Sequence, residues 1–82
     1  MQRADIVRRL REVAVEIAEK ELPPMHEAQV IAEIGLDSLS TLEMVGMMER
    51  ELGVFLPTDE LAEIRTIGDL TDLIEKKLAA RV

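Results

Sequence analysis

The residues with the clearest chemical potential lie in the stretch "GLDSLS", where Ser38 follows Asp37 and precedes Leu39. The chain also has a single histidine, His26, and no cysteine. A Ser–His–Asp hydrolase is formally possible, because a serine nucleophile needs a base and a carboxylate that orients the base. The lack of cysteine excludes thiolate nucleophiles, disulfides and cysteine-based metal sites. The question is therefore what purpose the Ser38 hydroxyl serves.

The residues around Ser38 argue against hydrolysis. A nucleophile elbow has glycines two positions before and after the serine, whereas this chain has Leu36 and Ser40 there. The sequence "GLDSL" also differs from the GDSL hydrolase signature by the additional Leu36. The acidic pairs lack the Asp/Asn-Gly spacing of a calcium loop. We therefore expect no catalytic residue and no metal site, and we interpret His26 as a surface residue of a loop.

Length and composition predict one small domain covering residues 1–82. Hydrophobic residues make up 48% of the 82 residues and charged residues 33%, which is an ordinary globular balance. Because aromatic residues are only 1% of the chain, the core must be aliphatic. No signal peptide is recognisable, and no apolar run approaches the ~20 residues that a membrane helix needs. We expect a soluble, cytoplasmic monomer that is free-standing rather than part of a larger synthase.

The net charge of −7 indicates the kind of partner that the surface favours. Such a surface repels the phosphates of nucleic acids and attracts basic protein surfaces. We therefore expect protein partners and no nucleic acid.

The hydrophobic pattern predicts an all-α fold, a small four-helix bundle of three longer helices and one short helix, with a long loop between the first two. Prolines end the first helix, Asp37 or Ser38 begins the second, and Gly53 closes it. Thr58 is expected to cap the short helix, and Thr66 with Asp69 forms the spacing of a capping box. The predicted helices cover residues 4–22, 38–52, 59–64 and 66–78, and the loop covers residues 23–37.

Periodic apolar positions predict the core. They recur at helical spacing within each predicted helix, and three apolar residues of the long loop (Val30, Ile31 and Ile34) are expected to pin it to the bundle. The core positions predicted in this way are Ile6, Leu10, Val13, Ile17, Met48, Leu52, Ile64 and Leu70.

The helix that begins at Ser38 is expected to have two apolar faces. Thr41, Met44, Val45, Met48 and Leu52 fall on the core face. A second face combines Ser38 with exposed leucines and glutamates, which is the composition of a binding patch with an apolar centre and a charged rim. A merely solvated face is the alternative. The residues of this second face are Ser38, Leu39, Leu42, Glu43, Gly46 and Glu49.

The stretch "GLDSLSTLEMVGMMEREL" resembles the phosphopantetheine attachment region of acyl carrier proteins, whose hallmark is Asp-Ser-Leu at the start of the second helix. The segments "IAEIG", "LPTDEL" and "IRTIGDLTDLI" match the same family, so the resemblance covers nearly the whole chain. It implies that a phosphopantetheinyl transferase moves 4′-phosphopantetheine from coenzyme A to Ser38. The thiol of this arm would then carry acyl thioesters between enzymes, so the chain would be a carrier and not an enzyme.

The resemblance also implies which residues meet the partners. The transferase and the acyl-loading and synthase enzymes of this family present basic docking patches with apolar centres. The residues implied to contact them are Asp37, Leu39, Leu42, Glu43 and Glu49.

Several features differ from the common pattern of the family. Gly46 replaces a bulky apolar residue, Leu36 replaces a small one, and four arginines make the first helix basic. These departures favour specialised, polyketide-type biosynthesis over fatty-acid synthesis. A D-alanyl carrier, an aminoacyl or peptidyl carrier, and a helical interaction module without cofactor are the alternatives.

Overall fold

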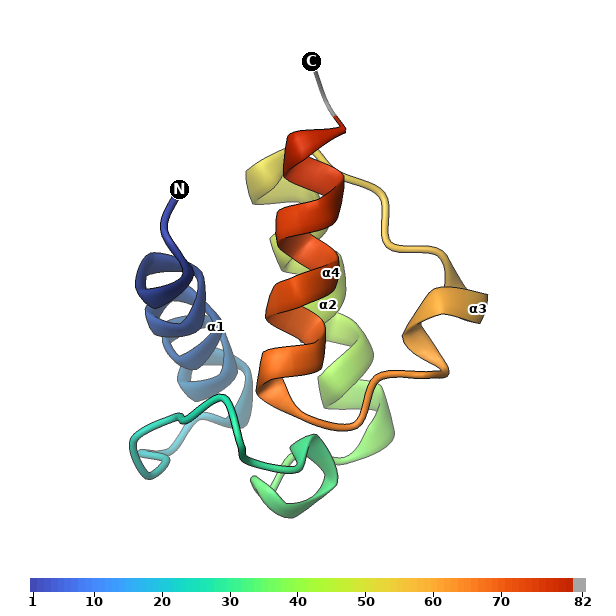
Figure 1. Cartoon of the computed structure of the whole chain (residues 1–82). Coiled ribbons are helices and arrows are strands. Elements are labelled where there is room, and N and C mark those ends of the chain that lie inside the picture. Colours follow the sequence, from blue (N-terminus) through green and yellow to red (C-terminus); the bar gives the residue numbers. More distant parts are fainter. Residues whose placement is uncertain (81–82) are drawn as a thin grey trace.

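The computed structural model describes residues 1–80 and confirms the all-α four-helix bundle. Figure 1 shows α1 running in the opposite direction to α2 and α4, with the short α3 to one side and the long α1–α2 connection crossing one end of the bundle. No helix within residues 1–80 is both long and apolar enough to span a membrane. The elements are α1 (Arg3–Ala18), the 3-10 turn η1 (Ile31–Glu33), α2 (Ser38–Leu52), α3 (Thr58–Leu61) and α4 (Ile67–Ala79).

The aliphatic core lies where α1 packs against α2 and α4. Most of the predicted core positions are buried there, but Ile17, Leu52 and Ile64 are only half-buried and pack against its edge. Thr71 is the buried polar residue among those described, and its hydroxyl donates to the Ile67 carbonyl at 2.8 Å. The side chains with almost no exposure include Ile6, Leu10, Val13, Met44, Met48, Ile67, Leu70 and Ile74.

The first helix ends earlier than predicted, at Ala18 instead of Leu22. Glu19 adopts a left-handed conformation (φ 56°), and its amide donates to the Val15 carbonyl at 2.9 Å. This turn redirects the chain so that Leu22 is buried against the core. The helix therefore ends in the left-handed turn at Glu19, before it reaches the prolines that were predicted to end it.

Apolar residues of the long loop pin it to the bundle, as predicted, and backbone hydrogen bonds also join it to the start of α4. Ile31 and Ile34 are buried, while Val30 is half-buried and forms a backbone bridge to Thr66. The loop carbonyls of Gln29 and Glu27 also accept hydrogen bonds from the first amides of α4, at 3.0 and 2.8 Å. Because helix N-terminal amides lack partners within their own helix, these bonds fix the loop firmly.

The short helix differs from its prediction at both ends. Pro57, not Thr58, occupies the N-cap position, and no side chain caps this helix. Thr58 is the first helical residue, and the helix ends at Leu61. An ion pair between Glu60 and Lys77 (2.9 Å) ties α3 to α4. The fixed φ of proline suits the entry to a helix, which accounts for the shift of the cap by one residue.

The predicted capping box of α4 is confirmed, and it makes stability depend on the charge of Asp69. The amides of Arg65 and Thr66 donate to this carboxylate, both at 3.1 Å, and hold the pKa of Asp69 below its ordinary value of 3.8. A lowered pKa means that the stabilisation is complete above pH 3.8 and is lost as the pH falls through the folded-state value. We expect Asp69→Asn to lower the melting temperature at neutral pH. The difference in melting temperature between this variant and the native chain should narrow below pH 3.8. A difference that stays constant with pH would show that the carboxylate charge does not matter.

Candidate functional site

Asp37 fixes the start of α2. Its Oδ1 accepts the amide hydrogen of Ser40 at 2.7 Å, and its carbonyl accepts from both the amide and the hydroxyl of Thr41, each at 2.9 Å. The Ser40 amide holds the pKa of Asp37 below its ordinary value. An ionised N-cap of this kind satisfies a free amide and complements the positive end of the helix dipole. The predicted cap is therefore confirmed, and it locks the backbone on either side of Ser38.

Ser38 is the first residue of α2, and it is exposed. Its neighbour Leu39 is also exposed, to 66%. Ser38 therefore stands at a helix N-terminus, where the positive end of the helix dipole favours a negatively charged substituent such as a phosphodiester. The residues present at this position thus fit a phosphate-linked group.

An open cleft of about 790 Å³ adjoins Ser38. Its walls come from α2 and the loop before it, and from α3, α4 and the segment between them, and most of the side chains are apolar. Such a cleft can shield an apolar chain tethered at Ser38 from water. The sequence reasoning missed it, because segments distant in the sequence form its walls. The residues lining it include Ser38, Leu42, Val45, Ile31, Leu61 and Ile64.

The two predicted faces of α2 are both present. Met44, Val45 and Met48 are buried against the bundle. On the other side Leu42 is 58% exposed, and Glu43 is exposed as well. Because Leu42 follows Ser38 by four residues, these groups lie on one helical face. An apolar and acidic surface therefore borders the Ser38 hydroxyl.

Glu49 has a structural contact that the sequence did not indicate. Its Oε2 accepts the amide hydrogen of Leu56 at 2.8 Å, and the residue is half-buried. Leu56 is itself buried, so the carboxylate holds the α2–α3 loop against the core. Glu49 lies on the predicted face but is less available to a partner than Glu43.

His26 and Ser38 are not brought together. His26 is exposed in the α1–α2 loop, where it lines a groove that shares no residue with the Ser38 cleft. Within residues 1–80 no three histidine, aspartate or glutamate side chains are grouped so that they can hold a metal ion. The arrangement at Ser38 therefore suits the attachment of a group and not a serine–histidine pair.

Comparison with known proteins agrees with this geometry. A family model described as "Phosphopantetheine attachment site" matches residues 8–74. The anthracycline acyl carrier protein DauA of Streptomyces sp. (strain C5) is 41% identical over 76 residues, covering 89% of this chain and 90% of DauA.

Solved structures match along the whole bundle. A crystal structure of an acyl carrier protein from Thermotoga maritima superposes with a TM-score of 0.88 at 30% identity, covering 98% of this chain and 94% of the other. The hexanoyl carrier protein of the actinorhodin polyketide synthase of Streptomyces coelicolor gives a TM-score of 0.75 at 31% identity, with 89% and 90% coverage.

A four-helix bundle with a phosphopantetheine attachment region is the scaffold of a carrier protein. The chain belongs to the acyl carrier protein family. It carries acyl groups on a covalently attached 4′-phosphopantetheine, which supplies the thiol that a chain without cysteine lacks.

Proposed function

We propose that the Ser38 hydroxyl is the attachment point of the phosphopantetheine arm, and that the chain carries intermediates of a polyketide-type pathway. The observation that carries the attachment site is the exposed Ser38 at the first position of α2, directly after its cap Asp37 and beside the apolar cleft. The likeness to DauA, an anthracycline carrier, and to the actinorhodin carrier supports the pathway class. We also propose that the chain works in the cytoplasm.

Mass spectrometry tests this proposal. The chain is incubated with coenzyme A and a phosphopantetheinyl transferase, and the peptide containing Ser38 is examined for the added arm. The loaded chain is then offered to a malonyl transferase of a polyketide pathway and to a D-alanine–carrier ligase. We expect malonyl but not D-alanyl loading. Preferred D-alanyl loading would replace the polyketide assignment, and failure to accept the arm would leave only a helical interaction module.

We further propose that the exposed face of α2 docks the transferase and the synthase enzymes. Its apolar centre and acidic rim complement basic surfaces, and electrostatic steering suits the brief encounters of a shuttle. Glu49 contributes charge here while it also holds the Leu56 amide. The docking residues are Asp37, Leu39, Leu42, Glu43 and Glu49.

Leu42→Ala and Glu43→Lys are expected to slow phosphopantetheine transfer and later acyl loading without unfolding the bundle. Leu42→Ala removes an exposed apolar anchor, and Glu43→Lys replaces attraction to a basic partner with repulsion. Salt screens exposed charges, so the Glu43→Lys defect should shrink at high ionic strength, whereas the Leu42→Ala defect should persist. Loading rates and melting temperatures at low and high salt measure both effects. Normal loading by both folded variants would place docking elsewhere.

A further inference from the structure

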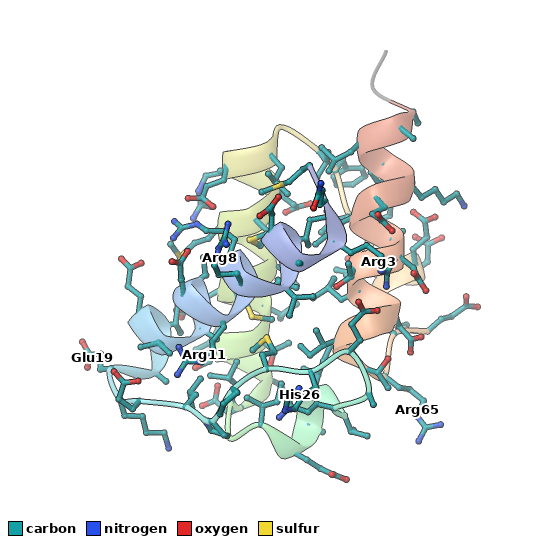
Figure 2. All side chains as sticks on the ribbon, turned by 60° about the vertical axis from the view of Figure 1, so that its left-hand side comes forward. Arg3, Arg8, Arg11, Glu19, His26 and Arg65 are labelled. Atoms are coloured by element: carbon teal, nitrogen blue, oxygen red, sulfur yellow. The ribbon has the colours of Figure 1, made fainter. Side chains whose placement is uncertain are left out.

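The segment that contains α3, residues 57–64, contributes to one wall of the open cleft and is anchored at both of its ends. Just before it, the buried Leu56 donates its amide hydrogen to Glu49 of α2 at 2.8 Å. Just after it, the carbonyl of Arg65 accepts the amide hydrogen of Ile31 at 2.9 Å. Figure 2 shows the Arg65 side chain pointing away from the bundle, so the backbone provides this second anchor. The two ends of the segment are therefore fixed to the rest of the bundle.

Between these anchors the segment packs loosely. None of residues 57–64 is buried, and the backbone hydrogen bonds from Leu61 to Pro57 (3.0 Å) and from Ile64 to Leu61 (3.1 Å) lie within the segment. Leu61 and Ile64 are half-buried; they pack against the edge of the core and also line the cleft. A segment with so few buried contacts can open at a smaller cost in free energy than the whole fold. The position of α3 therefore depends on what holds its middle.

An ion pair holds the middle of the segment. The Lys77 ammonium of α4 lies 2.9 Å from Oε2 of Glu60, and the two side chains are 26% and 29% exposed. This carboxylate oxygen itself has almost no exposed surface and accepts no well-aligned hydrogen bond, so the ammonium is its charged partner. A carboxylate oxygen that is shielded from water and has no counter-charge is costly, because its lost hydration is not replaced. Glu60 therefore favours this position of α3 only while Lys77 faces it.

We propose that the Glu60–Lys77 ion pair is a latch, which keeps the α3 wall closed over an acyl chain in the cleft and so determines how firmly the cleft retains that chain. Loss of the ammonium leaves the shielded oxygen without a counter-charge, and outward movement of residues 57–64 returns this oxygen to water. The same movement takes two apolar side chains of the wall away from the cleft. Glu60 and Lys77 are thus positioning residues, since neither of them lines the cleft. Retention of the acyl chain rests on the proposed attachment of the arm to Ser38, whereas the latch itself does not.

Hydrogen exchange of the full chain without its arm, followed by nuclear magnetic resonance, tests the latch. A helix of four residues cannot keep its own hydrogen bonds once it leaves the bundle, so opening exposes the amides of Leu61 and Ala62. We expect Lys77→Met to speed their exchange about threefold, because losing a partly exposed ion pair shifts an equilibrium by a factor of this order. The Met48 amide of α2 should exchange at the native rate. Equal acceleration at Met48, or unchanged exchange at Leu61, would overturn the proposal.

Lys76→Met is the matched control, because Lys76 is exposed, adjoins Lys77 on α4 and loses the same charge on substitution. It should leave exchange in α3 at the native rate. Glu60→Gln should act like Lys77→Met, and it remains available if that variant folds poorly. The double variant should exchange no faster than either single variant, because both substitutions break the same contact. Equal effects of Lys76→Met and Lys77→Met, or additive effects in the double variant, would contradict the latch.

The effect on the acyl chain is tested with an octanoyl thioester on the arm. Hydroxylamine attacks the thioester carbonyl carbon, which releases the thiol of the arm and octanoyl hydroxamate. We expect this cleavage to be about threefold faster in Lys77→Met than in the native chain, because an open wall leaves the octanoyl group in water. An acetyl thioester, which has no chain to retain, should be cleaved equally in both.

Equal octanoyl cleavage in the Lys77→Met variant and the native chain would overturn retention of the acyl chain by the latch. Failure of the arm to attach to Ser38 would instead contradict the proposed function. The exchange measurements would still decide whether the latch exists, because they use the chain without its arm.

Discussion

Ser38→Ala is expected to abolish loading with phosphopantetheine and to leave the fold intact. No other group in the proposed site offers a hydroxyl at the start of α2 next to the cap. The side chain of Ser38 is exposed, so its loss removes no core contact, and alanine is a good residue for a helix. Mass spectrometry after incubation with coenzyme A and a transferase measures the loading, and far-ultraviolet circular dichroism measures the helix content.

Ser40→Ala is the matched control, since Ser40 is the second serine of the chain and lies two residues further along the same helix. Its amide, which donates to Asp37, is retained in the variant. We expect Ser40→Ala to load at the native rate. An arm found on Ser40, or loading of the Ser38→Ala variant, would contradict the assignment of Ser38 as the attachment site. It would also show that the position next to the N-cap does not determine where the arm is attached.

The second helix could be placed from the sequence because its boundaries are set by local chemistry. Asp37 bonds an amide three residues on, and Gly53 takes the left-handed conformation (φ 65°) that glycine adopts without steric cost. The same holds for Thr66 and Asp69 at the start of α4. Interactions that span three or four residues leave a recognisable pattern in the sequence.

Features that depend on tertiary packing could not be placed in this way. The first helix ends at Glu19 in a left-handed conformation, which glutamate rarely adopts, and Leu22 beyond this turn is buried against the core. The hydrogen bond from the Leu56 amide to Glu49 likewise joins a helix to the loop after it. The cleft beside Ser38 forms only where segments distant in the sequence meet, so the sequence indicated Ser38 as the candidate attachment residue but not the cleft beside it.

Truncation of the core is expected to have the largest effect on stability. Leu10 of α1 and Met48 of α2 have no exposed surface, and both belong to the cluster where the helices meet. Replacing either residue with alanine removes buried methylene groups and leaves a cavity, which costs about 2–5 kcal/mol. The whole free energy of unfolding of such a domain is only about 5–15 kcal/mol. Each variant should therefore lose a large part of its stability, measured by denaturant unfolding.

Leu42→Ala provides the control for this measurement, because Leu42 lies on α2 with Met48 but is 58% exposed, whereas Met48 has no exposed surface. An exposed leucine gives up little buried area on truncation, so its loss should change the free energy of unfolding by no more than about 0.5 kcal/mol. Comparing the free energies of unfolding of Met48→Ala and Leu42→Ala thus distinguishes the two faces of one helix. One face stabilises the bundle, and the other is exposed to solvent. A cost below about 1 kcal/mol at both Leu10 and Met48 would contradict this division, as would a large loss of stability in Leu42→Ala.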